Sequence, residues 1–276
     1  MTHAGGAYRA REMNTDLARE IARLGEQARW AWDKEARNLG WFGLRDGMAI
    51  LEVGSGPGFI TAQLLALCPH SHVTCVEIDA DLTGPADRYL RGRGLAGRYS
   101  ITQGDVARLP LPADRFDFAV ARVVFQHLPD PAAALAEIRR TLKPGGKLVI
   151  TDVDVGLGEI YGPRDAAADA VEAKLPSTME QRGGDPRIGR RLWGLLAAAG
   201  YVDLDLEAIP IHSDATDPDL LFPPEWDPGA YKAALDAGVM TAADLETMRR
   251  AHVALQAAPD KYALFISLMV GGAKPR

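Results

Sequence analysis

The sequence predicts an α/β fold in which helices cover both faces of a mostly parallel sheet. Three observations predict it. Short apolar runs of strand length alternate with helical periodicity over residues 48–155, and Gly and Pro mark the boundaries. The first strand leads through a glycine-rich turn directly into a helix. Because crossovers between parallel strands are right-handed, the carboxyl ends of these strands meet at one edge of the sheet, where such folds bind ligands.

The spacing of apolar residues predicts the individual elements. We expect strands at residues 48–53, 73–78, 99–103, 116–124, 148–155, 202–209 and 262–270. We expect helices at residues 16–39, 60–68, 87–93, 131–142, 190–199, 228–237 and 241–256. Asp130 is the expected N-cap before Pro131, whose missing N–H costs nothing at the first helical position. Thr241 and Asp244 have the spacing of a capping box.

Composition excludes several classes of protein. The 276 residues are 47% hydrophobic and 25% charged, as in an ordinary globular chain. Lys and Arg total 31 against 37 Asp and Glu, a formal charge of −6, which disfavours nucleic acid as a partner. No apolar stretch approaches the roughly 20 residues of a membrane span, and the first residues lack a signal-peptide pattern. Cys68 and Cys75 are the expected small core residues of a cytoplasmic protein.

The strongest chemical signal is the turn LEVGSGPGF at residues 51–59. Glycines there allow positive φ values and a close approach of ligand to backbone, and free N–H groups at the following helix start suit a carboxylate or other anion. A nicotinamide fingerprint, G-x-G-x-x-G, would place its third glycine at position 59, where Phe59 stands. A glycine-rich turn alone also occurs in α/β proteins without a nucleotide.

Two acidic residues follow at successive strand ends. Glu77 closes the second strand, 23 residues past Gly54, where a carboxylate can accept both hydroxyls of a ribose. Asp105 follows the third strand, where it can accept from an adenine amine while Val106 packs on the ring. A lone loop Asp is more often a turn former. The order of the three sites nevertheless favours a bound nucleoside.

The sequence resembles class I S-adenosylmethionine-dependent methyltransferases, closest to the branch that modifies quinones, sterols and natural products. The motifs that carry the resemblance are EVGSGPG at 52–58, EID at 77–79, GDVARLP at 104–110, FDF at 116–118 and LKPGG at 142–146. They agree in order and spacing over about residues 48–154. The remainder matches only in general layout.

The resemblance implies a Rossmann-like, seven-stranded sheet whose last strand, at 262–270, runs antiparallel between those at 147–153 and 202–209. It implies a single domain over residues 1–276. An N-terminal helical cap would cover 1–46 and a cofactor-binding half 47–154. A substrate half would cover 155–276, with lid insertions at about 155–188 and 214–258. The cofactor would be S-adenosylmethionine, with S-adenosylhomocysteine as second product.

The resemblance also implies roles for single residues. The loop residues expected at the methionine end are Glu52, Gly54, Ser55, Gly56 and Gly58. Glu52 would orient the loop, and Arg122 would offer its backbone carbonyl to the methionine ammonium. The residues expected at the adenosine end are Glu77, Ile78, Asp105 and Val106.

The methyl of a sulfonium is already activated, so alignment and exclusion of water could supply most of the catalysis. His127 follows the fourth strand and is the candidate general base, with loop packing as the alternative. His212 is a weaker candidate. Asp152 and Asp154 lack a third ligand nearby, so we expect no metal; one should cap a loop and the other line the pocket.

The acceptor is expected to be a small, partly hydrophobic molecule, with oxygen, nitrogen or carbon left open as the methylated atom. Residues 121–126, ARVVFQ, lack the Asn/Asp-Pro-Pro-aromatic motif of nucleic-acid amino-methyltransferases. Candidate lid side chains are Tyr161, Met179, Phe222, Pro223, Pro224, Trp226 and Tyr231, and Trp30 and Trp32 could close over the cofactor. Alternatives are a quinone- or sterol-type C-methyltransferase, a cyclase or regulator that binds the cofactor without methylating, and an NAD oxidoreductase. A homo-oligomer also stays open.

Overall fold

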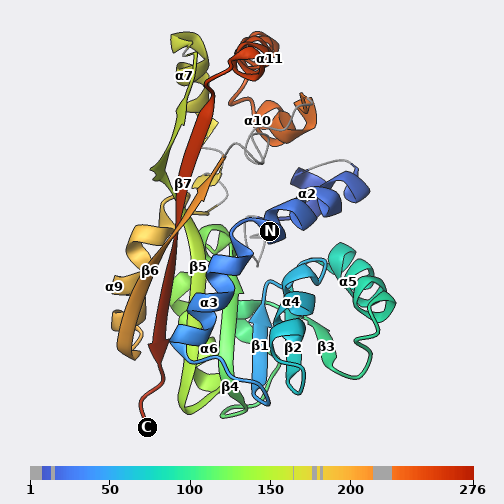
Figure 1. Ribbon diagram of the computed structural model, residues 1–276, viewed down its shortest axis with the longest axis vertical. Coiled ribbons are helices and arrows are strands. Elements are labelled where there is room, and N and C mark those ends of the chain that lie inside the picture. Colours follow the sequence, from blue (N-terminus) through green and yellow to red (C-terminus); the bar gives the residue numbers. More distant parts are fainter. Residues whose placement is uncertain (1–7, 14–15, 164, 176–178, 181–182, 214–225) are drawn as a thin grey trace.

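One seven-stranded sheet organises the chain (Figure 1). The computed structural model describes residues 8–13, 16–163, 165–175, 179–180, 183–213 and 226–276. The strands are β1 (Ala49–Val53), β2 (His72–Glu77), β3 (Tyr99–Gln103), β4 (Phe116–Arg122), β5 (Leu142–Tyr161), β6 (Val202–His212) and β7 (Tyr262–Ala273). Their order is β3-β2-β1-β4-β5-β7-β6. The first five are parallel, whereas β7 runs antiparallel to both β5 and β6. The predicted fold class is confirmed, including the antiparallel last strand.

Helices cover both faces of this sheet. They are α1 (Ala10–Met13), α2 (Leu17–Arg29), α3 (Trp32–Phe42), α4 (Phe59–Leu67), α5 (Ala80–Gly92), α6 (Pro131–Thr141), α7 (Ala166–Glu172), α9 (Leu192–Ala198), α10 (Lys232–Asp236) and α11 (Ala242–Ala257). Single 3-10 turns are η1 (Val106–Arg108), η2 (Phe125–His127), η3 (Ile188–Arg191) and η4 (Pro228–Tyr231).

Adjacent side chains of β1 point to opposite faces of the sheet and pack into two different hydrophobic cores. Leu51 joins a cluster that contains Leu135 of α6 and Leu192 of α9, whereas Ile50 joins one that contains Phe42 of α3 and Leu64 of α4. All six of these side chains are buried. Because successive strand residues point to opposite faces, a strand buried on both sides reads as one continuous apolar run.

The N-terminal segment departs from the prediction of one helix over residues 16–39. The chain breaks between α2 and α3 at Ala31, which adopts φ 54°. The carbonyl groups of Gln27 and Trp30 at the end of α2 accept hydrogen bonds from Nη2 of Arg122 at 3.1 Å each. The apolar stripe continues through both helices, so periodicity alone could not reveal the break.

Strands β5 and β7 extend past the rest of the sheet as a paired arm. Their pairing continues from Gly158 opposite Phe265 to Tyr161 opposite Tyr262. Glycine is required at 158, because a Cβ there would lie 2.3 Å from the Phe265 ring. The arm carries α7 and α11, which form a small third core with α10 (Figure 1).

Several other boundaries also differ from the sequence predictions. Helix α5 starts at Ala80 rather than at 87, since Asp79 caps it by accepting the Asp81 N–H. The helices expected at 190–199 and 228–237 each divide into a 3-10 turn and a short helix. The caps at Asp130 and Thr241 are confirmed. None of the helices in the described part of the chain is long and apolar enough to span a bilayer.

Candidate functional site

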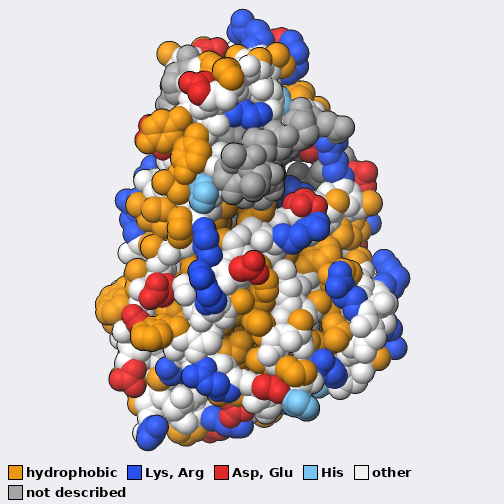
Figure 2. Space-filling view, in the orientation of Figure 1, with side chains coloured by type: hydrophobic (Ala, Val, Ile, Leu, Met, Phe, Trp, Pro, Cys, Tyr) orange, Lys and Arg blue, Asp and Glu red, His pale blue; other side chains and the backbone are white. Residues whose placement is uncertain are grey.

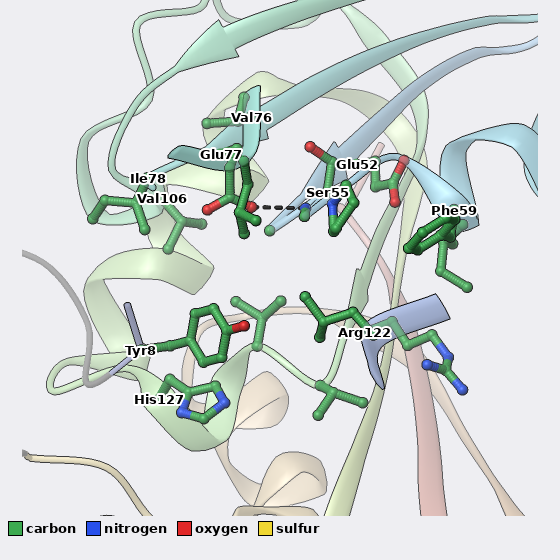
Figure 3. A pocket seen from close by; sticks show the side chains of 18 of the residues that line it. Tyr8, Glu52, Ser55, Phe59, Val76, Glu77, Ile78, Val106, Arg122 and His127 are labelled. Atoms are coloured by element: carbon green, nitrogen blue, oxygen red, sulfur yellow. Dashed lines mark hydrogen bonds between the residues drawn. The ribbon is translucent and has the colours of Figure 1, made fainter. Parts of the chain in front are cut away.

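A cavity of about 310 Å³ lies at the carboxyl ends of the central strands (Figure 3). Its size falls within the range of small-molecule sites. The sequence predicts ten cofactor-binding residues and one candidate base, and ten of these eleven residues line the cavity: Glu52, Gly54, Ser55, Gly56, Glu77, Ile78, Asp105, Val106, Arg122 and His127. The parallel topology brings these residues together although they are spread over more than seventy positions of the chain.

The glycine loop forms one wall of the cavity. Gly54 has φ 69°, and a Cβ there would lie 2.3 Å from Cγ2 of Val124. Gly56 has φ 53°, and a Cβ there would enter open space. The amides of the loop ahead of the helix start are bonded within the protein. Those of Gly54 and Ser55 donate to the Val76 carbonyl, and that of Gly56 donates to Glu77.

Gly58 is the sequence candidate that does not line the cavity. It adopts φ 83° as the N-cap of α4. A Cβ there would lie 3.1 Å from Leu90 and 3.4 Å from Ala86, both on α5. This glycine therefore lets α4 and α5 pack closely and shapes the site from behind.

Glu77 is a buried carboxylate held from two sides. Oε2 accepts the Gly56 N–H at 2.7 Å, and Oε1 accepts the Asp79 N–H at 2.8 Å. Burial raises the pKa of Glu77 above its usual range, against the lowering effect of these two hydrogen bonds. Each oxygen keeps a further lone pair that can accept a hydroxyl.

The adenosine end of the cavity is apolar with one acidic edge. Ile78 and Val106 supply apolar side chains, and Val106 is buried (Figure 3). Asp105 caps η1, because its Oδ1 accepts the Ala107 N–H at 2.9 Å. Its Oδ2 accepts no hydrogen bond from the described residues. Asp105 is thus both a turn former and a cavity residue, so the two readings of the sequence are compatible.

Glu52 lies beneath the loop at the end of β1. It is buried, and the Thr61 hydroxyl donates to its Oε2 at 2.6 Å. Burial, opposed by the Thr61 hydrogen bond and aided by the nearby Glu77 charge, raises the pKa of Glu52 to about 8. The group can therefore change its protonation state near neutral pH when a cation arrives.

Arg122 closes the end of β4, and its side chain turns toward the N-terminal helices. It forms a two-pronged ion pair with Glu35 of α3, with Nε–Oε2 and Nη2–Oε1 distances of 2.9 Å. The two side chains are 10% and 3% exposed. This buried pair ties α3 to β4, and the hydrogen bond from Arg122 to the Gln27 carbonyl holds the end of α2 at the cavity wall.

His127 lies in η2, packed against a residue that the sequence did not single out. Its ring centroid is 5.3 Å from that of Tyr8, at an angle of 53° (Figure 3). Burial first, and then the charge of Arg23, lowers the pKa of His127 to about 4. The imidazole is therefore neutral at physiological pH and able to accept a proton. Its ring nitrogens hydrogen-bond to none of the described residues.

The N-terminal segment supplies cavity residues that sequence reasoning missed. They are Tyr8, Arg23, Leu24, Gln27 and Ala28. The Ala10 N–H donates to Oδ2 of Asp79 at 2.8 Å, which ties α1 to the end of β2. Contacts this distant in sequence leave no local signal. Only the helical periodicity of α2 indicated an apolar face, and it did not say which surface that face covers.

Other sequence candidates lie elsewhere. Asp152 is buried and accepts the N–H groups of Gln126 and Val153, so it caps the η2 loop as expected. Asp154 does not line the cavity, because it pairs with Arg190. No group of three potential metal ligands occurs among the described residues.

The aromatic candidates divide in the same way. Trp30 and Trp32 pack against the core beside α3 rather than over the cavity. His212 and Tyr161 each lie beside Tyr262 on the β5–β7 arm. Trp226 stacks on Tyr231 at 5.2 Å within the third core, and Met179 does line the cavity. Residues 222–224, Phe-Pro-Pro, fall outside the described part of the chain.

Comparison with known proteins identifies the domain. Residues 51–150 match the family model described as "Methyltransferase domain". This segment, residues 51–150, is a methyltransferase domain of the class I S-adenosylmethionine-dependent type. An uncharacterised methyltransferase of Schizosaccharomyces pombe is 33% identical over 172 residues, 60% of this chain and 59% of that protein. A ubiquinone/menaquinone biosynthesis C-methyltransferase of a Shewanella species is 32% identical over 111 residues, 40% of this chain and 44% of that protein.

The methyltransferase fold extends beyond the matched segment. A phosphoethanolamine N-methyltransferase 2 of Haemonchus contortus, in complex with S-adenosylhomocysteine, superposes with a TM-score of 0.57 at 18% identity. The superposition covers 89% of this chain and 53% of that one. The chain spans less than two thirds of the length of the two relatives named above.

The cavity of the methyltransferase domain fits S-adenosylmethionine, the cofactor of this family. The open space beside Gly56 would be filled by any Cβ, so the backbone itself forms that wall. Glu77 is buried with lone pairs left for two ribose hydroxyls. Ile78 and Val106 would flank the adenine, and Asp105 would accept from its amine.

Proposed function

We propose that this chain transfers a methyl group from S-adenosylmethionine to a small, partly hydrophobic organic acceptor. The observation that carries the proposal is the unit formed by the glycine loop and Glu77, which opens into the same cavity as the neutral imidazole of His127. The bound cofactor would supply an electrophilic methyl. The protein would align the acceptor and exclude water, which is the larger share of such catalysis.

Each residue of the site has a separate task in this proposal. Glu77 would fix the ribose, while Asp105, Ile78 and Val106 would fix the base. The Arg122 carbonyl would accept from the methionine ammonium, because the side chain of Arg122 is held away by Glu35. His127 would accept a proton from an acceptor hydroxyl or carbon acid, since its ring nitrogens hydrogen-bond to none of the described residues; a pKa of about 4 makes it a weaker base than an ordinary histidine.

The acceptor end supports a small molecule rather than a polymer. Tyr8, Leu128 and Met179 line it, so the surroundings are largely apolar. Tyr8 and helix α2 contribute side chains to the cavity wall, leaving the cavity poorly suited to an extended strand. Lys and Arg side chains on the face shown in Figure 2 are scattered among acidic and apolar ones. Nucleic-acid sites instead gather basic residues into a patch.

A second candidate is carbon methylation of a quinone-type ring. It is supported by the 32% identity to the Shewanella enzyme, whose name describes a C-methyltransferase of ubiquinone and menaquinone biosynthesis. The match covers 40% of this chain, which is too little of it to assign the acceptor. We therefore keep the broader acceptor class as the proposal.

Two measurements test the proposed function. Calorimetric titration should show binding of S-adenosylmethionine and S-adenosylhomocysteine, with NAD giving no heat of binding. A screen of phenols, quinols, amines and carboxylic acids should then yield one product heavier by a single methyl group, with stoichiometric S-adenosylhomocysteine. Fragmentation of that product locates the methyl on oxygen, nitrogen or carbon. Binding of NAD in preference to S-adenosylmethionine would overturn the proposal.

A further inference from the structure

Arg23 presents a fixed positive charge to the cavity. Its Nε and Nη2 donate to the two oxygens of Glu20, at 3.0 and 2.6 Å. Glu20 is 1% exposed and also accepts the Tyr8 hydroxyl at 2.7 Å. The Arg23 side chain is 46% exposed, although it lines the cavity. A buried carboxylate thus orients the guanidinium from behind and leaves its other edge on the cavity side.

The other cationic side chains and the loop amides around the cavity offer an anion no fixed positive charge, and the Ser55 hydroxyl, which has no partner among the described residues, is a neutral donor. Nε and Nη2 of Arg122 donate to Glu35, and Nη2 also donates to two backbone carbonyls. His127 is neutral at physiological pH. The amides of Gly54, Ser55 and Gly56 donate within the protein. Nη1 of Arg23 donates to no carboxylate or carbonyl of the described residues, so among the described cavity residues Arg23 is the cation best placed to meet an anion.

S-adenosylmethionine brings one anion into the cavity, its α-carboxylate. The cavity walls are acidic elsewhere, since Glu52, Glu77 and Asp105 all line it. These carboxyl groups can accept hydrogen bonds from the ammonium and the hydroxyls, but they offer no positive charge to a carboxylate. A carboxylate transferred from water needs a charged partner to offset its lost hydration. Gln27, one helical turn beyond Arg23 and also in the wall, lies beside Arg122 and so links the guanidinium to the methionine end.

We propose that Arg23 binds the α-carboxylate of S-adenosylmethionine and that Glu20 positions Arg23 for this contact. The inference rests on the proposed function, because it concerns the same cofactor. It goes beyond the motif residues, since Arg23 lies on the N-terminal helix outside the segment matched by the family model. Arg23 is thus a binding residue, and Glu20, which acts through it, is a positioning residue.

Comparing S-adenosylmethionine with its decarboxylated form tests the contact. The two ligands differ only in the carboxylate, so the ratio of their dissociation constants isolates the interaction. The unmodified chain should bind the decarboxylated form about tenfold to a hundredfold more weakly, the usual range for a charge-assisted hydrogen bond. Arg23→Met should lose S-adenosylmethionine affinity by a similar factor and bind the two ligands almost equally.

A matched control comes from the same helix. Arg29 pairs with Glu26 at the surface and does not line the cavity, so Arg29→Met should leave both affinities unchanged. Arg23→Lys keeps the charge but loses the fork that Glu20 holds, and should retain part of the discrimination. Thermal unfolding of each variant verifies the fold. Should Arg23→Met not fold, the Arg23→Lys comparison decides.

The outcomes separate the two proposals. If the unmodified chain binds no S-adenosylmethionine, the proposed function fails and this contact fails with it. If the chain binds the cofactor but Arg23→Met and Arg23→Lys keep the full penalty for decarboxylation, Arg23 does not bind the carboxylate. An Arg23→Met variant with unchanged cofactor affinity and a raised KM for the acceptor would also overturn the inference, and would assign the guanidinium to an anionic acceptor.

Discussion

The amide of Gly56 donates to Oε2 of Glu77 across 2.7 Å, so the loop after β1 and the carboxylate that ends β2 form one unit. The contact explains why a buried acidic side chain is tolerated at a strand end. The same contact holds Gly56 where its missing side chain leaves room for a ligand. A change at either residue should therefore act on cofactor binding more than on the core.

Gly56→Val should abolish measurable cofactor binding while the fold survives. The valine side chain would occupy the open space beside the loop, and the φ of 53° adds a strain of about 1–2 kcal/mol. Gly97→Val is the matched control, because Gly97 also has positive φ and open space around it but lies outside the cavity. Titration calorimetry on both variants checks this. Unaltered affinity in Gly56→Val would contradict the cofactor site.

His127→Ala should lower kcat by about 10²–10⁴-fold if the imidazole is the base. With a pKa of about 4, His127 should stay neutral from pH 8 to pH 5, so its own protonation should not reduce the rate over that interval. Rates at saturating acceptor over this pH interval give the measurement. A variant that turns over almost normally would leave His127 with a packing role beside Tyr8.

The same pKa predicts a pH dependence of stability. An unfolded histidine binds its proton near pH 6.5, whereas His127 in the folded chain does so only near 4. Between these values the unfolded state carries more protons, so stability falls as pH falls from 6.5 to 4. His127→Gln should remove this contribution, so the difference in free energy of unfolding between pH 7 and pH 4.5 should shrink by up to about 3 kcal/mol in denaturant titrations.

Glu52→Gln should stabilise the chain free of ligand at pH 8. Because the folded pKa of Glu52 is raised to about 8, the folded state holds more protons than the unfolded state between pH 4.5 and 8. The contribution of Glu52 to stability therefore declines as pH rises through this interval. The neutral amide of Glu52→Gln has no such pH dependence, so the free energy of unfolding at pH 8 should be higher by on the order of 2–4 kcal/mol. Equal unfolding free energies of both proteins at pH 8 would argue against the raised pKa.

Arg122→Met should destabilise the chain by about 3–5 kcal/mol, since it leaves Glu35 buried and unpaired. The double variant Arg122→Met, Glu35→Met should recover much of the loss, because both charges are then absent. Urea unfolding of Arg122→Met, of Glu35→Met and of the double variant completes a double-mutant cycle, which gives the interaction free energy of the pair. Strictly additive losses would show that the two side chains do not interact.

The sequence predicted the sheet well because parallel strands are buried on both faces and leave apolar runs such as 118–121. It also predicted most of the cavity, since motif residues at strand ends converge through topology. It failed where tertiary contacts decide. Ala31 breaks a continuous apolar stripe, and Arg122 satisfies the carbonyls exposed there.

The cavity residues that escaped prediction share one cause. Tyr8 and Arg23 reach the site only because Asp79 and Glu35 hold the N-terminal helices against distant strands. Nothing in their neighbouring residues signals that contact. Gly58 shows the converse, because its place in the motif suggested a ligand contact while its real neighbours are Leu90 and Ala86.

The position of Tyr8 has a practical consequence for handling the protein. Its ring lies against His127 and lines the cavity, so a label attached to this side chain would alter the site. The other terminus follows β7, where the Lys274 amide bonds to Gly146 at the opposite edge of the sheet (Figure 1). Attachment through residues beside Lys274 therefore leaves the cavity accessible.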